Sequence, residues 1–191
     1  MENNLGPSNL SGQVLINVCE KFEKRGGLEF RLSLPDRKMT EAVQEHAEKT
    51  RTCSSASITE FHNNGKWDKC GQRIAYSAPR DEVGSRSILL IKDISKEATL
   101  LRLDLEPKSI IDVAWAPDGH YIAVLSVKAS LSYNPIKLLF TLGGHPIGYR
   151  TYFVEIYDMT GTLVYRSNDD EIGTFDTGGV RILGASIAWT D

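Results

Sequence analysis

The sequence predicts a mainly β protein built from short antiparallel strands, with a short mixed α/β segment at its N-terminal end. Two observations carry this prediction. From about residue 56 onward, runs rich in Ile, Val, Leu and Tyr alternate with turn residues such as Pro117-Asp118-Gly119 and Met159-Thr160-Gly161, in which Gly supplies a positive φ. A motif that contains Trp67 also recurs around Trp115, as in folds that repeat one set of strands.

Eight runs have the length and composition of strands. β-branched and aromatic residues are enriched in them, and clusters of Gly, Pro, Asp or Ser separate them. Evenly spaced short strands of this kind are typical of an all-β sandwich, barrel or propeller. The expected strands cover residues 73–78, 87–94, 99–105, 109–116, 121–127, 152–159, 162–166 and 180–189.

The segment 1–55 differs in pattern from the rest and is expected to form a separate mixed segment, followed by the β region at 56–191. Apolar residues at helical spacing predict an amphipathic helix over 13–25. Residues 28–34 alternate strictly between apolar and polar, which predicts a half-buried strand. Residues 36–49 contain few apolar side chains and predict a solvated helix.

The repeat is anchored by tryptophan and glycine. Trp67 and Gly71 recur as Trp115 and Gly119, and Ile-Ala follows each glycine in the same register. A third, partial copy ends in Trp189, close to the end of the sequence. The shared register favours packing of the three tryptophans in the core over the alternative, which is stacking against a ligand.

Residues 111–124, with Trp115, Pro117, Asp118 and Gly119, resemble the signature of WD-repeat and TolB-like β-propellers. The copy at Gly71 resembles it more weakly, because Lys69-Cys70 replaces Pro-Asp. The resemblance covers about residues 58–191. It implies incomplete propeller-like antiparallel blades, about two blades and the first strand of a third. Since propellers serve many functions, it says little about chemistry.

A propeller ring needs at least four blades, so these blades are not expected to close a ring by themselves. Both outer sheet faces are expected to be apolar, and the strand over 28–34 is expected to cover one of them. The chain is therefore expected to self-associate through unpaired blade faces, to join a complementary propeller segment or to remain partly molten. An insertion at 128–150 interrupts the second blade and is a candidate interaction loop, with His145, Pro146 and Tyr149.

Composition and motif content argue against several classes of partner and cofactor. The formal net charge of −3 argues against a nucleic-acid partner, and no apolar run approaches the length of a membrane span. Three unevenly spaced cysteines fit reduced thiols in the cytoplasm, with one disulfide as the alternative. No cofactor motif is present, and the spacing of Cys53, His62 and Cys70 is not that of a metal site.

No residue set supports catalysis. Asp176-Thr177-Gly178 matches a motif of aspartic peptidases, and Gly184-Ala185-Ser186 matches half of a nucleophile elbow, but each is expected to be structural. We therefore expect a non-catalytic protein-interaction or scaffold module, a fragment of a larger propeller protein. The alternatives are the propeller portion of a prolyl-oligopeptidase-type serine peptidase without its hydrolase domain, and a truncated gene product.

Overall fold

The described part of the chain consists of strands and their connections. The computed structural model describes residues 10–20, 28–34, 36–42, 65–79, 87–132, 147–168, 172, 174–176 and 182–191, and no helix occurs among them. The strands are β1 (Gly12–Glu20), β2 (Leu28–Leu34), β3 (Lys38–Ala42), β4 (Lys66–Trp67), β5 (Arg73–Ala78), β6 (Ile88–Asp93), β7 (Ala98–Asp104), β8 (Ser109–Trp115), β9 (Tyr121–Ser132), β10 (Ile147–Asp158), β11 (Leu163–Arg166), β12 (Thr174–Asp176) and β13 (Ile182–Thr190).

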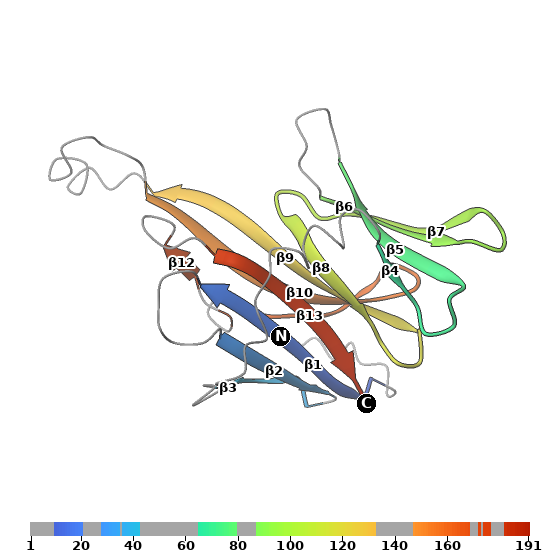
Figure 1. Cartoon of the computed structure of the whole chain (residues 1–191), viewed down its shortest axis with the longest axis horizontal. Coiled ribbons are helices and arrows are strands. Elements are labelled where there is room, and N and C mark those ends of the chain that lie inside the picture. Colours follow the sequence, from blue (N-terminus) through green and yellow to red (C-terminus); the bar gives the residue numbers. More distant parts are fainter. Residues whose placement is uncertain are drawn as a thin grey trace, which may run out of the picture.

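These strands form three antiparallel sheets (Figure 1). The first sheet has the order β4-β5-β6-β7, and the second has the order β11-β10-β9-β8 with β12 added beside β10. Both follow the chain as simple meanders. The third sheet has the order β13-β1-β2-β3, so it joins the C-terminal strand to the three N-terminal strands. The prediction of a mainly β fold with antiparallel, blade-like sheets is confirmed.

The N-terminal region differs from the expectation. The helix predicted over 13–25 is wrong for residues 13–20, because they lie in β1 and pair with β13 on one side and with β2 on the other. Val14, Ile16 and Val18 are fully buried on one face of this strand. Their alternation fits a strand as well as the wider apolar spacing fits a helix, and pairing with distant strands decides between the two.

Of the other two N-terminal predictions, the strand is confirmed and the helix is wrong where the structure describes it. The strand over 28–34 is confirmed as β2, whose Phe30, Leu32 and Leu34 are buried. The helix predicted over 36–49 is wrong for Lys38–Ala42, which is strand β3 paired with β2. Residues 43–49 lie outside the described part of the chain.

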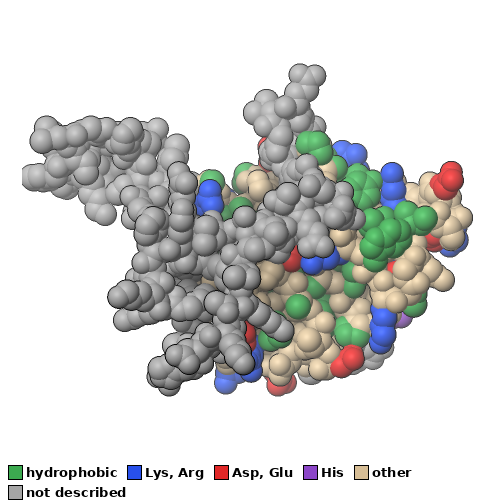
Figure 2. Space-filling view, viewed as in Figure 1, with side chains coloured by type: hydrophobic (Ala, Val, Ile, Leu, Met, Phe, Trp, Pro, Cys, Tyr) green, Lys and Arg blue, Asp and Glu red, His purple; other side chains and the backbone are tan. Residues whose placement is uncertain are grey.

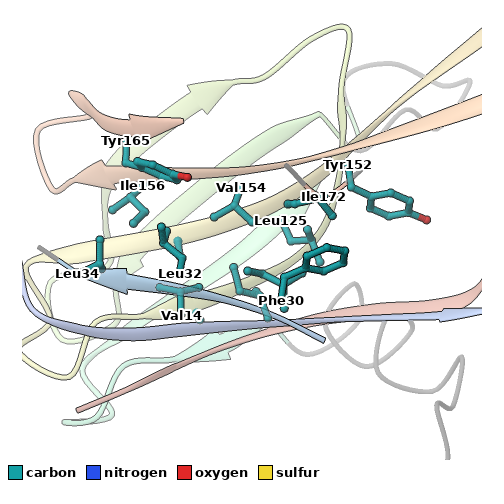
Figure 3. Close-up of a cluster of buried hydrophobic side chains, with 14 of the residues drawn as sticks. Val14, Phe30, Leu32, Leu34, Leu125, Tyr152, Val154, Ile156, Tyr165 and Ile172 are labelled. Carbon is teal, nitrogen blue, oxygen red and sulfur yellow. The ribbon is translucent and has the colours of Figure 1, made fainter. Parts of the chain in front are cut away.

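The second sheet lies between the other two and is buried on both faces. One core separates it from the third sheet, and Figure 3 shows its side chains pointing toward one another from the two layers. Val14, Phe30 and Leu32 meet Leu125, Val154 and Ile156 there. A second core separates it from the first sheet and contains, among others, Leu89, Ile91, Val113, Ile122, Val124 and Tyr157.

The ends of the predicted insertion at 128–150 are strand. β9 continues to Ser132 and β10 begins at Ile147, and these two residues pair with each other. The hairpin is therefore longer than the repeat predicts. His145 and Pro146 lie outside the described residues. Tyr149 belongs to β10, where its backbone is opposite Ser130 and Asp176.

A tryptophan-lined pocket where three edge strands meet

The strands β4, β8 and β13 each form one edge of a different sheet, and their C-terminal ends meet. Each of the three ends in or next to a tryptophan of the repeat. A pocket of about 410 Å³ lies between these ends. Its lining is Lys66, Trp67, Lys69, Val113, Ala114, Trp115, Ala116, Pro117, Trp189 and Asp191. Three residues that are far apart in the sequence but equivalent in the repeat therefore share one site.

Two equivalent hairpins place Trp67 and Trp115. After Trp67, the amide of Asp68 donates to the carbonyl of Arg73, and the amide of Gly71 donates to the carbonyl of Asp68. After Trp115, the amides of Ala116 and Gly119 donate to the carbonyls of Tyr121 and Ala116, which is the same pattern at the equivalent positions of the repeat.

The glycines of these hairpins have matching backbone conformations. Gly71 has φ 67° and Gly119 has φ 72°, in the left-handed region that other residues avoid. The predicted positive φ at Gly119 is confirmed. The turn after β10 confirms the second prediction of this kind, since Gly161 has φ 88°.

The tryptophans are less buried than core packing predicts. The side chain of Trp67 is 51% exposed, so the expectation is wrong at this position. Trp115 and Trp189 are only partly buried, and each packs against the margin of a core. The chain turns back directly after Trp67 and after Trp115.

Hydrogen bonds fix two of the three rings. Nε1 of Trp115 donates to the carbonyl of Lys66 at 2.9 Å, which links β8 to β4. Nε1 of Trp189 donates to the carbonyl of Ser11 at 3.1 Å, immediately before β1. The guanidinium of Arg73 lies 5.0 Å from the centre of the Trp115 ring and donates through Nε to Asp68. These contacts hold two pocket walls in place before any ligand binds.

A buried carboxylate, Asp112, links all three edge strands. Asp112 is 1% exposed. Its Oδ1 lies 3.3 Å from Nζ of Lys66 on β4, and its Oδ2 accepts a hydrogen bond of 3.2 Å from the amide of Ile187 on β13. Burial raises the pKa of Asp112, and the Lys66 charge and the amides of Ile187 and Val113 oppose this rise. The carboxylate orients Lys66, which lines the pocket.

The pocket mouth carries unlike charges. Lys69 and Asp191 both line it and both are exposed. Asp68, beside the mouth, is buried and paired with Arg73 at 2.8 Å. Burial alone would raise the pKa of Asp68, but the hydrogen bonds from Arg73 and Gln72 lower it below its usual value of 3.8. The pocket thus combines aromatic walls with a few charged groups.

The sequence does not predict this pocket, because the repeat favours a core position for its three tryptophans. Asp112 interrupts the apolar run SIIDVAW, and a lone carboxylate inside a buried strand is a signal of a fixed partner. Pro117 lines the pocket, and Oδ1 of Asp118 accepts a hydrogen bond from the amide of His120 at 2.8 Å. The repeat signature therefore forms the pocket margin as well as the turn.

The two peptidase-like motifs do not form catalytic constellations in the described residues. Gly184-Ala185-Ser186 lies within β13, a strand, and not at the strand-turn-helix junction that a nucleophile elbow requires. Asp176 lies in β12 beside β10, and Thr177 and Gly178 lie outside the described residues. Cys70 is an exposed free thiol in the turn between β4 and β5.

Within the residues that the structure describes, no three His, Cys, Asp or Glu side chains gather as a metal site would require. No described segment forms a helix with the length and hydropathy of a membrane crossing. The chain matches no model of a known protein family and no curated protein sequence.

Proposed function

We propose that this chain is a non-catalytic protein-interaction module built from WD-repeat-like blades, and that the tryptophan-lined pocket is its contact site. The observation that carries the proposal is Trp67, half exposed at a pocket that Trp115 and Trp189 also line. Tryptophan is enriched among the residues that dominate binding energy at protein interfaces. Three tryptophans gathered at one site form the kind of exposed apolar surface that marks protein contacts.

The backbone around the pocket favours a peptide as the ligand. The amide of Ala116 donates to Tyr121 across the β8–β9 hairpin. Because the groups of an antiparallel strand alternate in direction, the amide and carbonyl of the neighbouring Trp115 point away from β9. Main-chain groups at a strand edge beside aromatic walls match the way in which extended peptides are recognised. The volume of about 410 Å³ accommodates one or two side chains of such a peptide.

Selection of peptides from a random displayed library against the purified chain tests the proposal. We expect enriched peptides whose binding to Trp67→Ala is weaker by at least about tenfold, or roughly 1.4 kcal/mol. Ile94→Ala is the matched control, because Ile94 is 47% exposed and does not line the pocket. Enrichment of no peptide, or of peptides that bind Trp67→Ala as well as wild type, would contradict the proposal.

A further inference from the structure

One face of the first sheet packs on the second core, and the other face points away from that core. Ala75, Leu89, Ile91 and Leu101 point into that core, so the residues that alternate with them point to the other side. Strand pairing aligns these residues across the sheet, with Tyr76, Leu90 and Arg102 in one row and Ile74 beside Lys92 in the next. We call this surface the outer face and define it as Ile74, Tyr76, Leu90, Lys92, Leu100 and Arg102.

The outer face is apolar and accessible. Leu100 is 45% exposed, and Ile74, Tyr76 and Leu90 are half-buried. Figure 2 shows hydrophobic side chains gathered over this part of the molecule, with Lys and Arg side chains among them. Contiguous apolar surface with a charged border is typical of a protein–protein contact.

The outer face carries a net positive charge. Nζ of Lys92 lies 5.6 Å from the centre of the Tyr76 ring. Arg102 is exposed at the end of the row that contains Tyr76 and Leu90. Among the described residues neither cation has a carboxylate partner, and Asp104, which follows Arg102 on the same side of β7 and pairs with Ile88, is the carboxylate that borders the face. In a chain whose net charge is −3, this is a local cationic surface on an apolar base.

The outer side of the third sheet is different. There, Gln13, Asn17, Glu29, Arg31 and Ser33 alternate with the buried residues of β1 and β2, and Arg31 pairs with Glu29 at 2.7 Å. Leu15, opposite Arg31, also lies on this side, which is otherwise polar, and the charges of Arg31 and Glu29 compensate each other. The expectation that both outer faces are apolar is therefore wrong for the third sheet and holds only for the outer face of the first.

We propose that the outer face binds an acidic amphipathic segment of a partner protein. Its apolar stripe would cover Leu90 and Leu100, and its carboxylates would pair with Lys92 and Arg102. A second copy of this chain fits less well, because face-to-face contact would bring the two cations of each copy together with only Asp104 of each copy to compensate them. This inference rests on the proposed function in that the chain acts by binding proteins. It concerns a surface that borders the pocket at Trp67, which pairs with Ile74, and it specifies the chemistry of the partner.

A synthetic amphipathic peptide of Leu and Glu is the probe, and the same peptide with Lys for Glu is its charge control. Calorimetric titration measures binding to the wild-type chain and to Lys92→Glu/Arg102→Glu. We expect the acidic peptide to bind wild type, to bind the double variant at least about tenfold more weakly, and to weaken as salt is added. The Lys-containing peptide is expected not to bind.

Two further variants locate the binding. Lys128→Glu/Arg150→Glu makes the same charge change on exposed residues of the second sheet and is expected to bind like wild type. If Lys69→Glu in the pocket weakens binding and Lys92→Glu/Arg102→Glu does not, the outer-face proposal is overturned while the pocket proposal stands. Sedimentation gives the oligomeric state of wild type and of Lys92→Glu/Arg102→Glu. If wild type is a dimer and the double variant is a monomer, the proposal of an acidic partner is overturned in favour of a second copy.

Discussion

Gly119 shows how one residue type serves both the turn and the pocket. Its φ of 72° lies in the left-handed region, and a Cβ at this position would overlap Nη2 of Arg73. Arg73 cannot move freely, because its guanidinium pairs with Asp68 and packs over Trp115. The glycine therefore leaves space for the arginine that supports one wall of the pocket.

Gly71 provides the comparison that separates these two effects. It has nearly the same φ, but a Cβ there would meet no atom within 4 Å. We expect Gly71→Ala to lose about 1–2 kcal/mol of unfolding free energy through backbone strain alone. Gly119→Ala is expected to lose clearly more, because Arg73 must also move. Urea denaturation of both variants measures the difference, and equal losses would show that Arg73 yields without cost.

Glu155 is the most deeply buried charge among the described residues, with no exposed surface. Nε of Arg166 donates to its Oε1 at 2.7 Å, and Nζ of Lys108 approaches Oε2 at 2.6 Å as an ion pair rather than an aligned hydrogen bond. Burial, and then the Glu155 charge, raise the pKa of Tyr157. The two cations compensate the carboxylate and join β11 and the start of β8 to β10.

At the scale of elements, two hairpins share the same aspartate-centred turn. In the turns after β6 and β10, Oδ1 of Asp93 and of Asp158 accepts hydrogen bonds from the amide and hydroxyl of the residue two positions later, Ser95 and Thr160. The residues D-I-S and D-M-T carry this second repeat. The long β9–β10 hairpin shifts its spacing, so the fixed interval that relates Trp67 to Trp115 does not find it.

The Asp158 turn has a predictable pH dependence. Burial would raise the pKa of Asp158, but hydrogen bonds from Thr160, Thr162 and Gly161 lower it below 3.8. Because the folded state has the lower pKa, the stabilisation is complete above the unfolded value and is lost as the pH falls through the folded value. We expect Asp158→Asn to lose stability at pH 7 and to approach wild type only in acid, as the pH falls through the lowered folded pKa of Asp158.

Thermal unfolding of Asp158→Asn and wild type at a series of pH values measures this effect. The difference between the two melting temperatures is expected to shrink steadily as the solution is acidified. A difference that stays constant from pH 7 down to strong acid would mean that the turn gains nothing from the ionised form of Asp158.

At the scale of the whole molecule, Asp112 connects the three sheets through Lys66 on β4 and the amide of Ile187 on β13. Asp112→Ala removes the acceptor from the Ile187 and Val113 amides and leaves Lys66 without its carboxylate. We expect a loss of about 1–3 kcal/mol in unfolding free energy. Asp112→Asn keeps an acceptor at the same place and is expected to lose less. Urea denaturation of the two variants checks this order, and an Asp112→Ala chain as stable as wild type would contradict it.

The sequence by itself determines β2, the eight strands predicted from residue 73 onward, their turns and the repeat. Local chemistry is sufficient there, because alternation fixes which face of β2 is buried and glycine adopts the φ of 72° at Gly119 without strain. The strand over 28–34 and the equivalent hairpins after Trp67 and Trp115 follow from such local signals.

Only the tertiary structure decides how β1 folds and what the tryptophans do. Residues 13–20 are compatible with a helix until β13 and β2 pair with them, and the pairing with β13 joins segments from opposite ends of the sequence. The pocket likewise depends on three strand ends from three different sheets. A repeat in the sequence shows that Trp67, Trp115 and Trp189 are equivalent, but their exposure depends on which sheets surround them. That arrangement is a property of the packed sheets and not of any local pattern.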